Sequence, residues 1–180
     1  MVTGTRRQHG LIIVFTGNGK GKTTTALGMA LRAAGHEMRV LILQFMKKQR
    51  GIGEIKALEK TDLPITIKQF GRRVFFKTRT CEPMDMHMAH QGLEAFRQAM
   101  ARKAYDLIIL DEINIAIYFG LIEMSELMEV VQNKPPELHL VLTGRNARKE
   151  VIEIADLVTE MTEIKHHFNQ GINAQKGIEF

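Results

Sequence analysis

One segment near the start of the chain restricts the fold more than any other. An apolar run at 11–15 passes directly into Thr-Gly-Asn-Gly-Lys-Gly-Lys-Thr-Thr at 16–24, and the stretch Lys22 to Ala34 is predicted to be a helix that ends at Gly35. A buried strand, a glycine-rich loop and a helix in this order gather backbone amides and the helix N-terminus around one point. The segment therefore predicts a phosphate-binding loop in an α/β fold.

The rest of the chain repeats this alternation of strand and helix. Apolar runs without polar alternation predict strands that are covered on both faces, as in a parallel sheet. We expect one domain over 1–180, with a P-loop NTPase-like, open and mostly parallel sheet and helices on both faces. Residues 1–10 are expected to be flexible, and the tail at 165–180 to pack on the body. The expected strands are 11–15, 40–45, 65–70, 107–110, 138–142 and 157–161, and the other expected helices are 54–60, 84–103, 123–133 and 147–155.

Composition excludes several classes of protein. Cys81 is the single cysteine, so an internal disulfide and a four-cysteine zinc site are excluded. No apolar run reaches the ~18 residues of a membrane span, and the N-terminal segment with Arg6 and Arg7 has no apolar region before a cleavage site, so we expect a cytoplasmic protein without a signal peptide. The formal net charge of +5 suits either solubility or an anionic ligand. Basic and aromatic residues do not interleave, so no nucleic-acid partner is expected.

The loop predicts how a nucleotide is held. Glycines let the backbone approach phosphate oxygens, Lys22 can reach the distal phosphates, and the Thr23 hydroxyl can bind magnesium. The usual pattern is G-x-x-x-x-G-K-[ST], and its first position here is Thr16. Either the loop accepts Thr16, or Gly17 turns a loop that is one residue shorter; a plain Gly/Lys-rich turn is the alternative to a binding site. The residues expected to bind the triphosphate of ATP are Gly17, Asn18, Gly19, Lys20, Gly21, Lys22, Thr23 and Thr24.

A second polar position closes the apolar run at 107–110. Asp111 and Glu112 follow that run directly. In phosphate-loop proteins such a strand lies beside the first strand, and its acid holds magnesium directly or through water. The two carboxylates would face opposite sides if the strand continued, and the residues alone do not say which one is nearer to the metal. The alternative is a solvated strand end.

Taken together, these segments resemble the phosphate-loop ATP:corrinoid adenosyltransferases (the CobA/BtuR/CobO type). The likeness extends over nearly the whole chain from Gly10 onward. The phosphate loop alone is generic, whereas its combination with the later segments is specific. The segments are Gly-Asn-Gly-Lys-Gly-Lys-Thr-Thr at 17–24, Leu-Asp-Glu-Ile-Asn-Ile-Ala at 110–116, Leu-Val-Leu-Thr-Gly-Arg at 140–145, Ala-Asp-Leu-Val-Thr-Glu-Met at 155–161, Lys-His at 165–166 and Gly-Ile-Asn-Ala-Gln-Lys-Gly-Ile-Glu at 171–179.

The resemblance implies a reaction and its participants. Such enzymes transfer the 5′-deoxyadenosyl group of ATP to Co(I) of cobalamin or a related corrinoid and release triphosphate, in the synthesis or salvage of adenosylcobalamin. It implies Mg²⁺ or Mn²⁺, a homodimer and a flavoprotein electron donor. It makes Lys22 and Glu112 the catalytic candidates, and Thr23, Asp111 and Glu112 the metal ligands. Asn114 and Arg145 match motif positions without an assigned role.

The segment at 71–78 departs from the family pattern. Where well-known relatives read approximately Gly-x-Gly-Phe-Thr-Trp-Glu-Thr, this chain has Gly-Arg-Arg-Val-Phe-Phe-Lys-Thr. A bulky apolar residue there can exclude the lower axial base of the corrinoid, and cobalt with fewer ligands is easier to reduce. Val74, Phe75 and Phe76 are the candidates for this corrinoid-facing role, with core packing as the alternative.

Two other functions remain open at this stage. One is a P-loop phosphotransferase or ATPase, with Glu112 as the base and Arg145 as an arginine finger. The other is a non-catalytic nucleotide-binding sensor or carrier. Among the remaining polar residues, His87 and His90 beside Asp85 favour a solvated helix face over a metal site, and His166 and His167 are possible site residues. Cys81 is expected to be a packing or surface residue.

Overall fold

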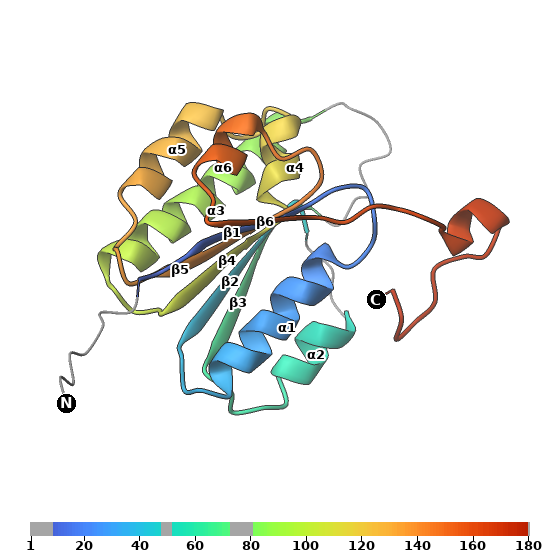
Figure 1. The fold of residues 1–180 in the computed structure, drawn as a ribbon, viewed down its shortest axis with the longest axis horizontal. Coiled ribbons are helices and arrows are strands. Elements are labelled where there is room, and N and C mark those ends of the chain that lie inside the picture. The colour runs from blue at the N-terminus through green and yellow to red at the C-terminus, as the bar shows by residue number, and fades with distance from the viewer. Residues whose placement is uncertain (1–8, 48–51, 73–80, 180) are drawn as a thin grey trace, which may run out of the picture.

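The core of the molecule is one open sheet (Figure 1). The computed structural model describes residues 9–47, 52–72 and 81–179. All the described strand pairings are parallel, which confirms the predicted α/β fold with an open parallel sheet. The strands are β1 (Ile12–Thr16), β2 (Val40–Phe45), β3 (Ile65–Phe70), β4 (Leu107–Asp111), β5 (His139–Thr143) and β6 (Leu157–Glu160).

Helices cover both faces of the sheet, as predicted (Figure 1). α1 (Lys22–Ala34) and α2 (Gly53–Leu58) lie on one face. The other face carries α3 (Pro83–Ala101), α4 (Ile113–Tyr118), α5 (Met124–Gln132) and α6 (Lys149–Glu153). The short helix α4 and the 3₁₀ turn η1 (His167–Gln170) were not predicted. A six-residue helix with isoleucine at every second position lacks the spacing of three and four that identifies an amphipathic helix.

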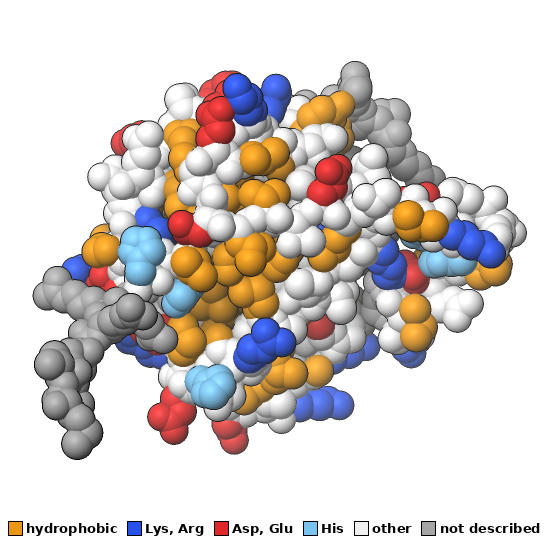
Figure 2. Space-filling view, viewed as in Figure 1, with side chains coloured by type: hydrophobic (Ala, Val, Ile, Leu, Met, Phe, Trp, Pro, Cys, Tyr) orange, Lys and Arg blue, Asp and Glu red, His pale blue; other side chains and the backbone are white. Residues whose placement is uncertain are grey.

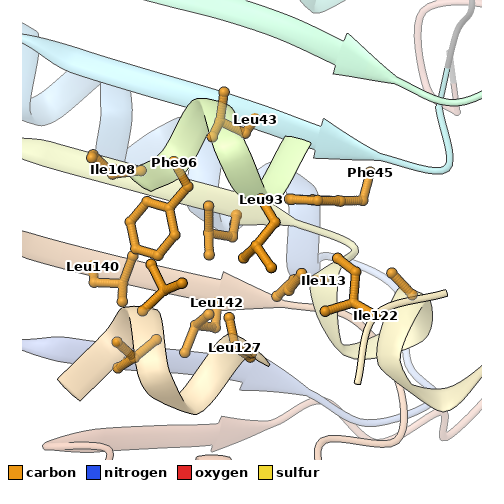
Figure 3. Close-up of a cluster of buried hydrophobic side chains, with 14 of the residues drawn as sticks. Leu43, Phe45, Leu93, Phe96, Ile108, Ile113, Ile122, Leu127, Leu140 and Leu142 are labelled. Atoms are coloured by element: carbon orange, nitrogen blue, oxygen red, sulfur yellow. The ribbon is translucent and has the colours of Figure 1, made fainter. Parts of the chain in front are cut away.

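Alternating strand side chains build two apolar layers. Val14, Ile108 and Leu140 pack with residues of α3 and α5 on one face, in the cluster that Figure 3 shows. Ile13 and Ile109 point the other way and pack on the alanine face of α1. Both sides of each central strand are therefore buried, which explains why the strands are apolar without alternation.

The order of the strands corrects one expectation. The sheet runs β3-β2-β4-β5-β1-β6, so β5 separates β4 from β1. The expectation that the acidic strand lies beside the first strand is therefore wrong. Since β1 pairs with β5 on one side and β6 on the other, neither of its edges is left for β4. Helix α1 contacts β1, β5 and β4. The helix that follows the phosphate loop therefore reaches the acidic strand, although β5 separates β4 from β1.

The β6 edge and the tail that follows it are largely exposed. Leu157 and Val158 of β6 are 45% and 40% exposed. Figure 2 shows hydrophobic side chains gathered across the middle of this face. Figure 1 shows the tail running out from the body and turning back, and near its end Glu179 forms an ion pair with Lys20. In the described ranges, no helix has the length and apolar character needed to cross a bilayer.

The glycine loop after β1 is built against the residue that follows β6. The amide of Gly19 donates to the carbonyl oxygen of Met161 at 2.7 Å, and the amide of Met161 donates to the carbonyl of Thr16 at 2.9 Å. Gly17 has φ of 91°, and a Cβ there would lie 2.4 Å from the Met161 carbonyl oxygen. Only glycine fits this position without a shift of the backbone.

We predict that Gly17→Ala destabilises the protein by at least about 2 kcal/mol, because it adds a left-handed conformation and a backbone clash. Gly28→Ala is the matched control, since a Cβ at this helical glycine meets nothing within 4 Å. The control should be neutral or stabilise by up to about 1 kcal/mol. Urea denaturation followed by circular dichroism measures both, and equal midpoints would contradict the assignment.

The start of α3 is held to the end of β3 by a partly buried ion pair. Arg72 donates to both carboxylate oxygens of Asp85, each at 2.6 Å. The amide of Glu82 also donates to Asp85, at 3.0 Å, which completes a capping box at the helix N-terminus. Asp85 is 3% exposed. The hydrogen bonds from Arg72 lower the pKa of Asp85 below its ordinary value of 3.8.

Asp85→Asn should therefore destabilise the protein at neutral pH, by about 1–3 kcal/mol. A folded-state pKa below that of the unfolded chain contributes stability above the unfolded value and loses it as the pH falls through the folded value. The difference between wild type and variant should accordingly shrink below about pH 4. Thermal denaturation from pH 7 to pH 3 checks this, and a pH-independent difference would argue against the ion pair.

Candidate functional site

The phosphate loop lies at the carboxyl end of β1 and closes around its own lysine. Gly21, with φ of 115°, precedes the first residue of α1. The side chain of Lys22 is buried, and Nζ donates to the carbonyl oxygens of Gly17 at 2.7 Å and Gly19 at 2.6 Å. Burial lowers the pKa of Lys22, and the nearby carboxylate of Glu112 opposes that effect. The loop thus carries a protonatable amine at its centre, with the amides of α1 directly behind it.

The position of Thr16 shows where the phosphate loop begins to turn. Thr16 is the last residue of β1, and its Oγ1 accepts a hydrogen bond from the amide of Ala147 at 3.2 Å. The left-handed turn falls on Gly17 instead. A threonine therefore fits the first position as a strand residue, and the loop turns one residue later.

The first turn of α1 meets the acidic strand at Asp111. Thr23 Oγ1 donates to Asp111 Oδ1 at 2.9 Å, although 88 residues separate them. Asp111 is 1% exposed, and Thr143 on β5 also donates to Oδ1, at 2.7 Å. Strand β5, which lies between β4 and β1, thus supplies a further donor to Asp111.

The second oxygen of Asp111 accepts from two further side chains. Gln44 Nε2 on β2 donates to Oδ2 at 3.0 Å, and Gln69 on β3 holds Gln44 in turn. Lys47 Nζ donates to the same oxygen at 2.8 Å. Two donors on each oxygen use the full acceptor capacity of a carboxylate. Burial alone would raise the pKa of Asp111, but Lys47 and the hydroxyl donors outweigh it, so the pKa is lowered and the group stays ionised.

Lys47 places an ammonium group where the predicted metal ligands converge. Besides Asp111, Nζ donates to Thr23 Oγ1 at 3.0 Å and lies 3.7 Å from Glu112 Oε1. Burial alone would lower the pKa of Lys47, but the charges of Asp111 and Glu112 outweigh it and the pKa is raised. A cation therefore already bridges the hydroxyl and both carboxylates.

The chain turns sharply between the two acids. β4 ends at Asp111, and Glu112 has φ of 64° as the residue before α4. Its amide donates to Thr143 Oγ1 at 3.0 Å. Since the strand does not continue, the carboxylates do not point to opposite faces, and both reach Lys47. Burial raises the pKa of Glu112 above its ordinary value.

Three predicted loop residues lie at the solvent side of this cluster. Asn18, Lys20 and Thr24 are exposed. Lys20 pairs with Glu179 from the tail, which also lies 3.7 Å from His167. The Lys20 ammonium thus already attracts an anionic group to the mouth of the loop.

Asn114 and Arg145 lie beside the cluster without joining it. Asn114 on α4 donates to the carbonyl of Gly144 at 3.2 Å, and its Oδ1 is the one buried side-chain oxygen or nitrogen without a partner among the described residues. Arg145 is exposed. Its positive charge adds to the effect of burial in lowering the pKa of Lys22, and it only partly opposes the burial that raises the pKa of Glu112. Asn114 therefore has a free acceptor, and Arg145 adds positive potential.

The other candidates lie elsewhere. Val74, Phe75 and Phe76 fall outside the described residues. His90 interacts with the Met86 carbonyl and Glu126, and the described ranges hold no group of three or more His, Cys, Asp or Glu side chains placed to bind a metal ion. The rings of His166 and His167 stack at 4.6 Å in the tail. Cys81 is half-buried and its thiol donates to the carbonyl of Phe119.

Sequence reasoning missed Gln44, Lys47 and Thr143. A polar glutamine inside the apolar run at 40–45 was an available signal, because a buried polar side chain needs a partner. Thr143 ends β5 at the same edge of the sheet at which β1 and β4 end. Lys47 lies close to Lys48 and Arg50 in the sequence, and nothing in the sequence places it against Asp111.

The residues present suit a divalent cation. A threonine hydroxyl and two carboxylates are oxygen donors of the kind that Mg²⁺ prefers, and they already surround one positive charge. The loop beside them can cradle phosphate oxygens. The arrangement therefore fits a nucleotide triphosphate with its magnesium ion.

Comparison with known proteins places the chain in a family. Residues 8–180 match the family described as ATP:corrinoid adenosyltransferase BtuR/CobO/CobP. The chain is 37% identical to a corrinoid adenosyltransferase of Pseudomonas aeruginosa, over 97% of this chain and 86% of that protein. It is 39% identical to one from Sinorhizobium sp, over 96% and 81%. It is 31% identical to the corrinoid adenosyltransferase CobA of Salmonella typhimurium, over 97% and 88%. The chain therefore belongs to the ATP:corrinoid adenosyltransferase BtuR/CobO/CobP family.

Proposed function

We propose that the site between β1 and β4 performs the family's corrinoid adenosyltransferase reaction and holds the triphosphate of ATP as a leaving group. Co(I) of the corrinoid attacks C5′ of ATP with its electron pair, the cobalt–carbon bond forms, and the C5′–oxygen bond breaks to release triphosphate. The observation that carries this proposal is the convergence of Lys22, Thr23 and Asp111 at one edge of the sheet.

The chain's own part in this chemistry is positioning and charge. Cobalt is itself the nucleophile, so no serine, cysteine or base has to be activated. Alignment of two reactants can supply about 7–11 kcal/mol in well-oriented cases. Lys22 and the loop amides would stabilise the negative charge that grows on the triphosphate, with Lys20 at the mouth of the loop. Glu112, the other catalytic candidate, would act through the cation rather than as a proton acceptor.

Magnesium is part of the proposal. Thr23 and Asp111 would hold it, with Glu112 beside them, and bound Mg²⁺ neutralises charge on the β- and γ-phosphate oxygens. Mn²⁺ prefers the same oxygen ligands. The hydrogen bond between Thr23 and Asp111 supports this assignment, because it already brings the two ligands together.

A homodimer and a flavoprotein electron donor complete the proposal. The exposed apolar residues of the β6 edge, Leu157 and Val158, support an interface with a second copy, because an uncovered edge strand invites pairing. A one-electron donor is needed because Co(II) must be reduced before it can attack. Light scattering during size-exclusion chromatography tests the dimer, and reduction of Co(II) by a reduced flavoprotein tests the donor.

We expect the protein, mixed with ATP, Mg²⁺ and chemically reduced cobalamin, to change the cobalamin spectrum to that of a cobalt–carbon bond and to release triphosphate over many turnovers. Lys22→Ala should lower the rate by about 10²–10³-fold, because it removes one charge from the leaving group. Lys60→Ala, in the exposed segment after α2, is the control and should keep the wild-type rate.

Three other outcomes of this experiment would contradict the proposed reaction. ADP and phosphate as products would indicate a phosphotransferase or ATPase. A single equivalent of product without turnover would indicate a carrier. An unchanged rate in Lys22→Ala would remove the phosphate loop from the reaction.

The metal assignment predicts a specific loss in Thr23→Val. Without the hydroxyl, the gain in ATP affinity that Mg²⁺ provides should fall about 10- to 100-fold, the range of one hydrogen bond to a charged group. Thr23→Ser keeps the hydroxyl and should behave as wild type. Titration calorimetry with Mg²⁺ and with EDTA measures the gain. If Thr23→Val kept the whole gain, Thr23 would not hold the metal.

A further inference from the structure

The clearest feature that the proposed reaction leaves unexplained is the ammonium group of Lys47. It donates to Thr23 Oγ1 at 3.0 Å and to Asp111 Oδ2 at 2.8 Å. These are the two oxygen ligands assigned to Mg²⁺ in the proposed function, and this inference rests on that assignment. An ammonium group that donates to both oxygens takes acceptor positions that a magnesium ion would need, and the two positive charges repel each other. The chain therefore carries an internal competitor for its own metal site.

The carboxylate of Asp111 has no acceptor capacity left for another cation. Thr23 and Thr143 donate to Oδ1, while Gln44 and Lys47 donate to Oδ2. A carboxylate offers about four acceptor positions, so a metal that binds here has to displace one donor.

Lys47 is the donor best placed to leave. The side chain of Gln44 is buried in the sheet and held by Gln69, and Thr143 is fixed by the amide of Glu112. Lys47 instead follows β2, and 26% of its side chain is exposed. It is also the one member of the four that repels a metal ion through its charge.

Displacement is unfavourable unless the ammonium group finds another anion. Moving it away from a carboxylate that is 1% exposed separates a buried pair of opposite charges. Glu112, 3.7 Å away, offers part of a new partner. The triphosphate of ATP, arriving in the adjacent loop together with the metal, offers the rest.

We propose that Lys47 is an exchangeable internal cation that occupies the Thr23–Asp111 site until a divalent ion arrives with a nucleoside triphosphate. It would keep Asp111 paired in the nucleotide-free protein and exclude free divalent ions. It would then move toward Glu112 and the triphosphate when the metal–nucleotide complex binds. Metal binding is thereby coupled to nucleotide binding by the chain itself.

The test measures binding of Mn²⁺ without nucleotide, from the loss of the free-ion signal in electron paramagnetic resonance. Wild type should bind Mn²⁺ weakly alone and tightly with ATP. Lys47→Met should bind Mn²⁺ alone about 10- to 1,000-fold more tightly than wild type, the range over which one neighbouring charge shifts a carboxylate equilibrium. Lys47→Arg keeps the charge and should resemble wild type. Lys60→Met removes an exposed lysine charge away from the site and should also resemble wild type.

A second measurement, the melting temperature, tests the proposal even if Lys47→Met is less stable than wild type. Loss of Lys47 leaves Asp111 without its cation, so the melting temperature of Lys47→Met should fall in EDTA and recover with Mn²⁺ alone. Wild type should gain little from Mn²⁺ alone. A variant that gains no more than wild type in either measurement would overturn the exchange. If no variant bound Mn²⁺ even with ATP, the metal assignment itself would fail along with the inference; tight binding of MnATP without any effect of Lys47 would overturn the inference alone.

Discussion

The buried carboxylate of Asp111 is the point on which the other parts of the site depend. Side chains from α1, from β2 and the residues after it, and from β5 all donate to it. Such a group is costly to bury unless it is fully paired, so the contacts act as one unit. Loss of a neutral donor leaves an oxygen of Asp111 short of a hydrogen bond, and loss of Lys47 also leaves its charge unpaired. The need to supply hydrogen bonds to Asp111 is consistent with the contact of α1 with β4, and with a threonine, Thr143, at the end of β5.

Much of this architecture could be predicted from local sequence. The strand–loop–helix unit at 11–34 was predictable because glycine, lysine and a helix-forming run each favour the same backbone. The two-sided burial of the central strands was predictable from runs such as that at 107–110, which lack polar alternation, whereas the similar run in β6 is exposed. The helix 22–34 was predicted with the observed bounds, because Gly35 ends it.

The remainder depends on contacts between distant segments. The place of β5 between β1 and β4 is fixed by crossover connections, which a strand's own residues do not encode. Helix α4 follows a left-handed turn at Glu112, and its isoleucines at alternate positions resemble a strand pattern. Lys47 was predictable as a basic residue but not as a partner of Asp111, since 64 residues separate the two. The loop and the acidic strand end could therefore be predicted from sequence, whereas the contact of Lys47 with Asp111 could not.

The attachment of the phosphate loop to Met161 has a consequence for the thermodynamics of binding. Because the amide of Gly19 is tied to the chain beyond β6, the loop is curved and ordered before any ligand arrives. The conformational entropy of fixing those residues has already been lost during folding, so little of it is subtracted from the affinity for an anion. The end of β6 thus stabilises the loop in advance, and substitutions along this strand should weaken the affinity for an anion by loosening the shape of the loop.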